Sequence, residues 1–118
     1  METTLQNAEQ ILLSHLQAIG TGNLDLLMQD YMEESVFITP SGVFKGLARI
    51  QGEFERLLAI YPPGSTFNLI QQTIEGNYIY LLWSGESEHI QIPFATDTFL
   101  LDNNKILLQT FAGQIIPK

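Results

Sequence analysis

The chain has 118 residues, the size of one compact domain, and 45% of them are hydrophobic, which is enough for a sizeable core. Its formal charge of −8 at pH 7 repels nucleic-acid phosphates and anionic lipid headgroups, so we expect neither nucleic acid nor a membrane as a partner. With no cysteine and only two histidines, the sequence excludes disulfides, thiol nucleophiles, thiolate metal sites and multi-histidine metal sites.

The N-terminal segment METTLQNAEQ has neither the basic region nor the apolar block of a signal peptide. No apolar run approaches the roughly 20 residues that a membrane-spanning helix needs. We therefore expect a cytoplasmic protein with a single domain over residues 1–118.

Two helices are predicted at the start of the chain. Hydrophobic residues recur at three- and four-residue spacing over residues 4–20, which indicates an amphipathic helix that ends at Gly20 and Gly22. His15 lies on its apolar side. Asn23 is a good N-cap for a second, shorter helix. The apolar side of that helix is formed by Leu24, Leu27, Met28 and Tyr31.

The middle of the chain is predicted to hold two short strands and a third helix, over residues 36–39, 43–45 and 47–60. Pro40-Ser41-Gly42 forms the turn between the strands, and Pro62-Pro63-Gly64 stops the helix. Arg49 and Glu53 lie on the predicted solvent side of this helix, at a four-residue spacing that permits an ion pair.

The rest of the chain is predicted to form strands, over residues 66–74, 78–84, 90–101 and 105–115. The last two are joined by a tight turn at Asp102-Asn103-Asn104. Pro93 has no backbone N–H, so it indicates a bulge or a sheet edge. Helices first and long antiparallel strands afterwards are typical of the α+β class.

Both faces of these strands are hydrophobic. In the strand over residues 78–84, the alternate positions that begin at Tyr78 and those that begin at Ile79 are all apolar. A sheet with one wet face would alternate instead. We expect the helices to cover one face and a second copy of the sheet to cover the other, which predicts a homodimer through the outer sheet face.

Asp97 interrupts the apolar pattern in the middle of the strand over residues 90–101. Aspartate is depleted from strand interiors, and a buried carboxylate is costly without a partner. Asp97 therefore points to water, holds a buried donor, or marks a site. His15 is either a core histidine bonded to a carbonyl or water, or an acid/base in a pocket.

Further residues are candidates either for a cavity lining or for ordinary core: Tyr31, Phe54, Tyr80, Phe99 and Phe111. Gln109 shares a strand phase with Phe111, so it faces either the pocket or a dimer partner. His89 follows Glu86-Ser87-Glu88, a cluster that indicates a solvated turn more than a metal site.

The order of these elements resembles a known fold. A helix, the segment GNLDLLMQDYMEESVFITPSGVFKG, a helix, and a hairpin meander ending in TDTFLLDNNKI are similar to the nuclear transport factor 2-like superfamily. Within it, the SnoaL-like polyketide cyclases and the ketosteroid isomerases are closest in pattern. The resemblance implies a cone-shaped α+β domain, in which a strongly curved antiparallel sheet wraps around three N-terminal helices and a pocket opens between them. These motifs are specific for the fold and not for one activity.

Ketosteroid isomerases use three polar pocket positions, which the resemblance places on this sequence one by one. A helix tyrosine corresponds to His15, seven residues before Gly22. An aspartate general base corresponds to Thr39, directly before Pro40, and a protonated strand aspartate corresponds to Asp97. The base is therefore missing, because a threonine hydroxyl does not abstract a proton from carbon at neutral pH unaided.

Three functions are compatible with these residues. The first is a mostly apolar pocket that binds a small hydrophobic, carbonyl-containing ligand, which His15 and Asp97 orient. The residues expected around that ligand are Tyr31, Thr39, Phe54, Tyr80, Phe99 and Gln109. The second is a cofactor-independent isomerase, cyclase or dehydratase, in which Asp97 is the acid/base, as in the SnoaL-like cyclases, and His15 polarises the oxygen. The third is a dimeric scaffold with a vestigial pocket.

The absence of a base at Thr39 favours the first and third functions over the second. Asp97 and His15 either form an ion pair or face each other across a cavity. We favour the cavity, because no basic residue is near Asp97 in the sequence. In that case burial keeps the acid protonated and the histidine neutral.

Overall fold

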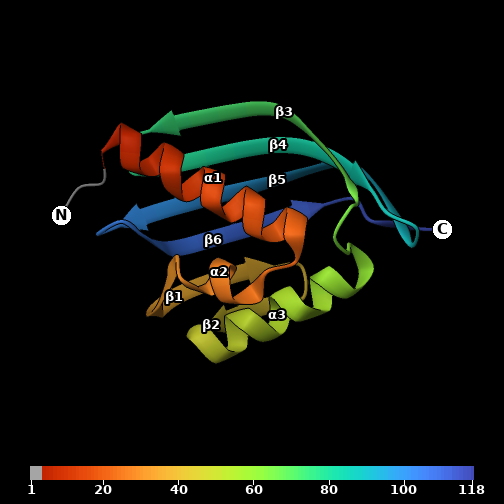
Figure 1. Cartoon of the computed structure of the whole chain (residues 1–118), viewed down its shortest axis with the longest axis horizontal. Helices are drawn as coiled ribbons and strands as arrows, with labels where there is room; N and C mark the ends of the chain where they lie inside the picture. Colours follow the sequence, from red (N-terminus) through yellow and green to blue (C-terminus); the bar gives the residue numbers. More distant parts are fainter. Residues whose placement is uncertain (1–3) are drawn as a thin grey trace.

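The computed structural model describes residues 4–118 as three helices and one seven-stranded sheet (Figure 1). In chain order the elements are α1 (Leu5–Thr21), α2 (Leu24–Met28), β1 (Tyr31–Thr39), β2 (Gly42–Lys45), α3 (Leu47–Ile60), β3 (Thr66–Glu75), β4 (Tyr78–Glu86), β5 (Ile90–Asp102), β6 (Lys105–Gly113) and β7 (Ile116–Pro117). The predicted α+β class is confirmed. Within the described residues, no helix is long and apolar enough to cross a membrane.

The first two helices start and stop where local hydrogen bonding predicts. The side chain of Thr4 caps α1 by accepting the backbone N–H of Asn7, and Gly22 ends it with a φ of 66°. Asn23 Oδ1 accepts the backbone N–H of Leu26 at 3.0 Å, so the expected N-cap of α2 is confirmed. A Cβ at position 22 would lie 2.7 Å from Pro63, so glycine also lets the α1–α2 turn touch the loop after α3.

The strand order is β2-β1-β6-β5-β4-β3, with β7 paired to β5. Neighbouring strands are antiparallel with one exception, because β1 and β6 run parallel. The expectation of a wholly antiparallel sheet is corrected at this pair. Parallel neighbours need a long connection, and here α3 and four strands separate β1 from β6 in the chain.

Tyr31 begins β1 and is not part of the second helix, which ends at Met28. The pairing of β1 with β6 shifts register between Tyr31 and Val36, which indicates a bulge. Ser35 secures this irregular stretch, because its Oγ accepts the Met32 backbone N–H at 2.9 Å and donates to the Ile106 carbonyl at 2.5 Å. The strand alternation expected from sequence is lost here, which explains why the strand was predicted to start only at residue 36.

Pro93 lies at a bulge, as expected. Trp83 pairs with Ala95 and Gly85 with Ile92, so that two residues of β5 lie opposite one residue of β4. The tight turn between β5 and β6 is also confirmed, because Asn103 and Asn104 both have positive φ, at 53° and 63°.

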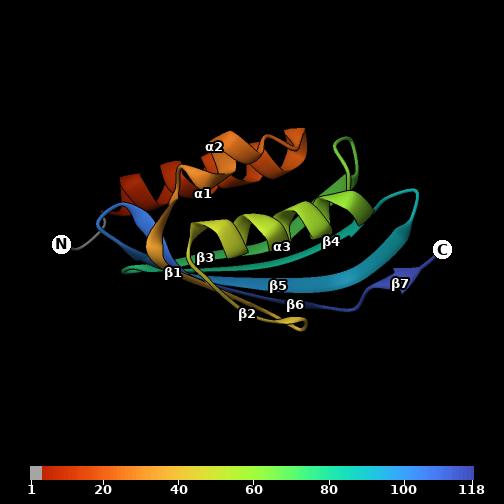
Figure 2. The ribbon, with the colours of Figure 1, turned by 90° about the horizontal axis from the view of Figure 1, so that it is seen from below.

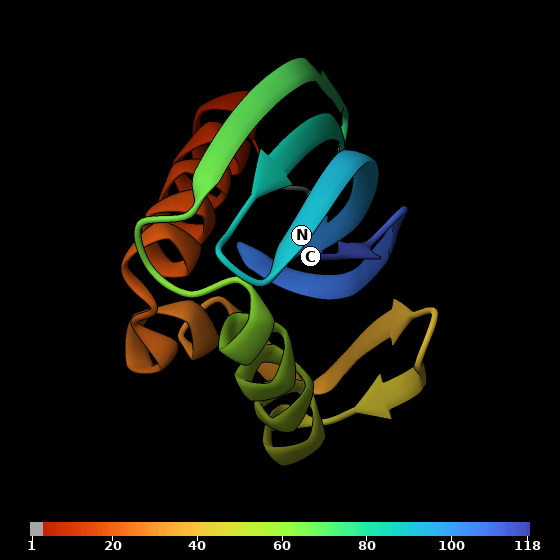
Figure 3. The same cartoon turned by 90° about the vertical axis from the view of Figure 1, so that its right-hand side faces the viewer.

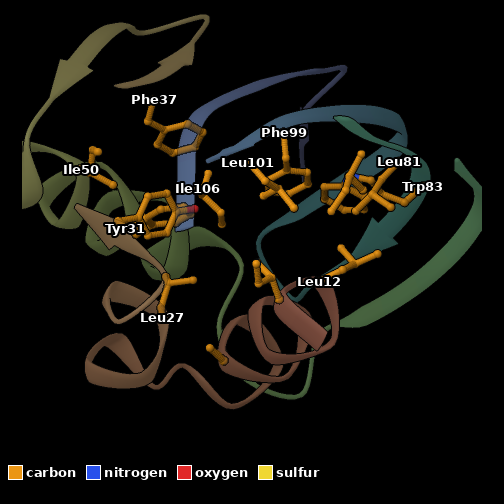
Figure 4. Close-up of a cluster of buried hydrophobic side chains, with 14 of the residues drawn as sticks. Leu12, Leu27, Tyr31, Phe37, Ile50, Leu81, Trp83, Phe99, Leu101 and Ile106 are labelled. Atoms are coloured by element: carbon orange, nitrogen blue, oxygen red, sulfur yellow. The ribbon is translucent and has the colours of Figure 1, made fainter. Parts of the chain in front are cut away.

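All three helices lie on one side of the sheet (Figure 2), and the end-on view shows the sheet curving around α1 (Figure 3). The core fills the space between them, where side chains of α1 such as Leu12 approach Leu81, Trp83 and Phe99 of the sheet (Figure 4). Within residues 4–118, no helix lies over the other face of the sheet. The resemblance implied a cone-shaped domain with a strongly curved sheet on three helices, and the structure shows this curved sheet, which is open and not closed on itself.

Candidate functional site

A cavity of ≈ 90 Å³ lies between the helices and the inner face of the sheet. Its walls are mostly aliphatic and aromatic, and come from α1, α3 and strands β1, β3, β4, β5 and β6. Three polar side chains from three elements converge on it: His15 from α1, Asp97 from β5 and Gln109 from β6. A small set of polar groups in an apolar enclosure is typical of a ligand site.

Asp97 is buried, with an exposed fraction of 8%, and both of its carboxyl oxygens are held by N–H donors. The Trp83 indole Nε1 donates to Oδ1 at 2.8 Å, and the Gln109 Nε2 donates to Oδ2 at 2.9 Å. Trp83 and Gln109 belong to the two strands that flank β5. The carboxyl group is thereby fixed in orientation by its sheet neighbours, and each oxygen keeps a lone pair for a ligand or a proton.

Tyr31 extends this network away from the cavity. Its hydroxyl donates to Gln109 Oε1, the oxygen of the same amide whose nitrogen donates to Asp97. The hydrogen bonds therefore form a chain that runs from the Tyr31 hydroxyl through the Gln109 amide to Asp97, and each donor in it lies on the side away from the carboxyl group. Burial raises the pKa of Tyr31 well above its ordinary value, so the phenol is neutral and donates.

Burial raises the pKa of Asp97 from 3.8 to about 6, and the hydrogen bonds from Trp83 and Gln109 offset only part of this effect. The expected direction is right, but a pKa near 6 leaves the carboxyl group mostly ionised at pH 7 when no ligand is bound. Among the residues that line the cavity there is no lysine or arginine to pair with it. The site therefore holds an acid whose protonation changes close to neutral pH.

His15 is neutral at pH 7, because burial lowers its pKa from 6.5 to about 4. Aromatic rings surround it: the ring centroid of Phe99 is 5.1 Å away, that of Phe54 6.1 Å and that of Tyr31 6.4 Å. Its Nδ1 is buried and has no hydrogen-bond partner among the described residues. A buried, unsatisfied nitrogen on the wall of a cavity is poised to bind a polar ligand atom.

The structure brings most of the predicted site residues together. Phe54, Phe99 and Gln109 line the cavity beside His15 and Asp97, and Tyr31 lies behind Gln109. The glutamine thus faces the cavity, which settles its strand phase.

Thr39 and Tyr80 lie outside the cavity. The hydroxyl of Thr39 donates to Oε2 of the buried Glu53 at 2.7 Å, on the far side of α3. Glu53 pairs with Arg56 at 2.8 Å, and the expected pairing with Arg49 is replaced by this one. Tyr80 is 36% exposed and points from the outer face of the sheet, because its neighbours Ile79 and Leu81 take the inner face.

Trp83 is a residue of the candidate site that sequence reasoning did not select. Its indole N–H is the donor that holds Oδ1 of Asp97, and its ring lines the cavity. The strand pattern could have indicated this position, since Trp83 and Leu81 share the strand phase opposite to Tyr80, and this phase faces the core. Residue pairs across β4 and β5 place Trp83 beside Ala95 and Leu81 beside Asp97, so the indole reaches along the sheet to the acid.

The architecture is shared with solved structures of low sequence identity. A SnoaL-like protein from Burkholderia thailandensis superposes with a TM-score of 0.76 at 14% identity, covering 97% of this chain and 99% of that one. A candidate isomerase of the SnoaL-like family from Agrobacterium tumefaciens gives 0.73 at 18% identity, covering 93% and 99%. An NTF2-like protein from Burkholderia xenovorans gives 0.75 at 20% identity, covering 92% and 84%.

Comparison with protein-family models gives no match, and comparison with curated protein sequences gives none either. The structural similarity shows that the chain has the nuclear transport factor 2-like fold. Because this fold carries many activities, the function has to be argued from the site itself.

Proposed function

We propose that this domain binds a small hydrophobic, carbonyl-containing molecule in the cavity between the helices and the sheet. The observation that carries the proposal is the buried carboxyl group of Asp97, held by Trp83 and Gln109 at the wall of an apolar cavity. In its acid form, which predominates below about pH 6, this carboxyl group donates a strong hydrogen bond to a carbonyl oxygen. His15 offers a second contact through its unsatisfied Nδ1.

The size of the cavity limits what it admits. Its ≈ 90 Å³ is less than the roughly 300–1,000 Å³ of common ligand pockets, and less than the ~150 Å³ cavity that holds benzene. In this form it accepts a compact molecule of a few heavy atoms or the carbonyl end of a longer one. A longer ligand requires partly exposed residues of the lining, such as Phe67 and Tyr61, to move.

Binding of a carbonyl to the acid form of Asp97 takes up a proton when the pH is above about 6. Above that pH, each additional unit therefore weakens binding by up to tenfold, because a smaller fraction of the free protein carries the proton. Affinity that is constant between pH 5 and pH 8 would contradict donation by Asp97.

Catalysis by the same residues is the second candidate: a cofactor-independent isomerase, cyclase or dehydratase with Asp97 as acid/base. The observation in its favour is the pKa of Asp97, about 6, since a general base works best when its pKa is near the operating pH. Neutral His15 would polarise the carbonyl oxygen as a hydrogen-bond donor and would not act as an imidazolium. The likeness to a candidate SnoaL-like isomerase is compatible with this reading.

A homodimer through the outer face of the sheet completes the proposal. Hydrogen-bonded register places Ile38, Thr110, Thr98 and Tyr80 in one row across β1, β6, β5 and β4. These side chains are at least partly exposed and none is charged. An uncharged row of side chains across a sheet face that no helix of residues 4–118 covers is suited to a second copy of itself.

Native mass spectrometry of the protein as purified tests ligand binding. We expect a retained small mass in the wild-type protein, its loss in Asp97→Leu, and its retention in the control Tyr80→Phe, which changes a side chain outside the cavity. Deuterium incorporation into a small ketone in D₂O then separates the two candidates, since only an enzyme accelerates exchange at the carbon beside the carbonyl. Absence of a retained mass, together with unchanged Asp97 resonances when ketones are added, would exclude both.

A further inference from the structure

A second concave site lies on the opposite side of α3 from the cavity. It is a groove of ≈ 390 Å³ between α3 and the β1–β2 hairpin, and none of its residues borders the cavity. The groove is lined by Ser41, Phe44, Arg49, Gly52, Glu53 and Arg56. Four of these belong to α3 at spacings of three and four residues, so they share one side of the helix.

The groove gathers the arginines of an otherwise acidic protein. The chain has five lysines and arginines against thirteen acids, and its two arginines, Arg49 and Arg56, both line this groove. They are seven residues apart, about 10 Å along the helix axis. With Glu53 counted, the groove carries a net charge of +1 on a chain of net charge −8.

Hydrogen bonds fix the guanidinium group of Arg56 in place. Its Nε donates to Glu53 Oε1 at 2.8 Å, and its Nη2 donates to Glu53 Oε2 and to Ser41 Oγ, both at 2.9 Å. Glu53 is 2% exposed and also accepts the hydroxyl of Thr39. The side chain of Arg56 nevertheless remains 51% exposed. A buried carboxylate thus holds a partly exposed guanidinium at the wall of the groove.

The exposed hydrogen-bonding groups that remain free in the groove are donors. Glu53 is buried and both of its oxygens already accept hydrogen bonds from Thr39 or Arg56, and both hydrogens of Arg56 Nη2 are used. The Nη1 of Arg56 has no hydrogen-bond partner among the described residues, and Ser41 Oγ accepts from Arg56, which leaves its own hydrogen free. With the guanidinium of Arg49, these donors match the oxygens of an anion.

Gly52 lies on α3 between the two arginines and keeps the groove open. Glycine in a helix interior costs about 1 kcal/mol relative to alanine. A Cβ at position 52 would have no atom within 4 Å, so no packing contact requires glycine there. The side chain that is missing at this position is the one that would fill the space between Arg49 and Arg56.

We propose that this groove binds the phosphate group of a small organic phosphate monoester. Arg49, the Nη1 of Arg56 and the Ser41 hydroxyl receive the phosphate oxygens, and the half-buried ring of Phe44 packs against the organic part. A dianion is favoured over a carboxylate because two guanidinium groups face one space with a single carboxylate between them.

NMR titration of the ¹⁵N-labelled protein tests the site, with phenyl phosphate and inorganic phosphate as separate titrants at constant ionic strength. We expect saturable shifts at Ser41, Arg49, Gly52 and Arg56, with no shift at Asp97 or Gln109. Phenyl phosphate should bind more tightly than inorganic phosphate, and acetate more weakly than both. Equal affinity for the two phosphates would overturn the role of Phe44, and equal affinity for acetate would overturn the assignment of a dianion.

Variants separate the groove from general charge effects. Arg49→Gln should weaken phenyl phosphate binding about tenfold, as expected for loss of a charge-assisted hydrogen bond. Lys118→Gln removes the same charge from a residue that pairs with Glu86 and should leave binding unchanged. Gly52→Leu should abolish binding while making the protein more resistant to urea. Shifts that never saturate, or equal affinity in Arg49→Gln and Lys118→Gln, would overturn the proposal.

Discussion

His15 and Asp97 face the same cavity. Burial lowers the pKa of the histidine to about 4 and raises the pKa of the acid to about 6, so the two values move past each other. The order of the two groups is thereby reversed relative to their ordinary values. Both are neutral between pH 4 and pH 6, which is the range in which two ordinary groups of these types are both charged. The cavity is therefore uncharged in mild acid and gains a single negative charge near neutrality.

The two displaced pKa values should have opposite effects on stability. The raised pKa of Asp97 means that the unfolded chain loses this proton first, so the free energy of unfolding falls as the pH rises from about 4 to 6. The lowered pKa of His15 means that the unfolded chain gains this proton first, so stability falls as the pH drops from 6.5 to about 4. Each effect is worth about 3 kcal/mol, and they cancel over most of this range.

Removing one group should expose the effect of the other. As the pH rises from 4 to 6, the free energy of unfolding of Asp97→Asn should increase by about 3 kcal/mol relative to wild type. That of His15→Phe should decrease by about 3 kcal/mol relative to wild type over the same range. Urea unfolding at intervals of half a pH unit measures both differences. Parallel curves for the wild type and the two variants would show that neither group has a displaced pKa.

Asp97→Asn and Asp97→Leu should differ strongly in stability. The asparagine oxygen still accepts the Trp83 indole N–H, and rotation of the Gln109 amide lets its oxygen accept the new amide N–H. Leucine leaves both buried donors unpaired, at a cost of about 1–3 kcal/mol each. At pH 4, where Asp97 is neutral, we expect Asp97→Asn to stay within about 1 kcal/mol of wild type and Asp97→Leu to lose about 2–5 kcal/mol. Equal stability would mean that the two donors find other partners.

An acid at position 39 should destabilise the protein. A carboxylate in place of the Thr39 hydroxyl would lie against the buried Glu53, and like charges at that distance cannot both stay ionised. Thr39→Asp should lose about 3 kcal/mol at pH 7, whereas Thr39→Val loses one hydrogen bond, about 1 kcal/mol. Lowering the pH to 5 should narrow the difference between them in thermal unfolding. If Thr39→Asp is as stable as Thr39→Val at pH 7, the site is more open to water than its burial indicates.

The proposed dimer should depend on the outer sheet face. Tyr80→Arg places a charge in the middle of the uncharged row, so it should convert the dimer to a monomer of 13.3 kDa. Leu13→Arg adds the same charge on α1, where the side chain is 62% exposed, and should leave the dimer intact. Sedimentation velocity at micromolar concentration distinguishes the two masses. A wild-type protein that sediments as a monomer would exclude this interface.

The pattern of the sequence predicted most of the elements, but not β7 or the start of β1 at Tyr31, and it did not decide which side of every strand faces the core. The spacing of apolar residues predicted α1 and α3, and the turn formers predicted the strand ends, because both signals are local. Tyr80 was assigned to the pocket because both phases of β4 are apolar, and alternation cannot choose between two hydrophobic faces. The inward phase is decided by the packing of Ile79, Leu81 and Trp83 against the helices, which is not a local property.

Thr39 and Glu53 show a second limit of prediction from the sequence. The resemblance placed Thr39 in a pocket, and helical spacing placed Glu53 on the solvent side of α3. In the structure the β1–β2 hairpin covers that side of the helix, so the acid is buried and takes its partners from both elements. No spacing within α3 reveals that a hairpin fourteen residues earlier lies across it. By contrast, Asp97 could be identified from the sequence as a candidate site residue, because an acid within a hydrophobic strand is unusual wherever that strand packs.

The contact between Trp83 and Asp97 gives the protein a built-in optical probe. Trp83 is the one tryptophan in the sequence, so all indole emission comes from a ring that lines the cavity and donates its N–H to the acid. Ionisation of Asp97 places a negative charge beside the indole nitrogen and should alter the emission spectrum, as should a molecule that contacts the ring. The unlabelled protein therefore reports by its own fluorescence both the proton on Asp97 and the filling of the cavity.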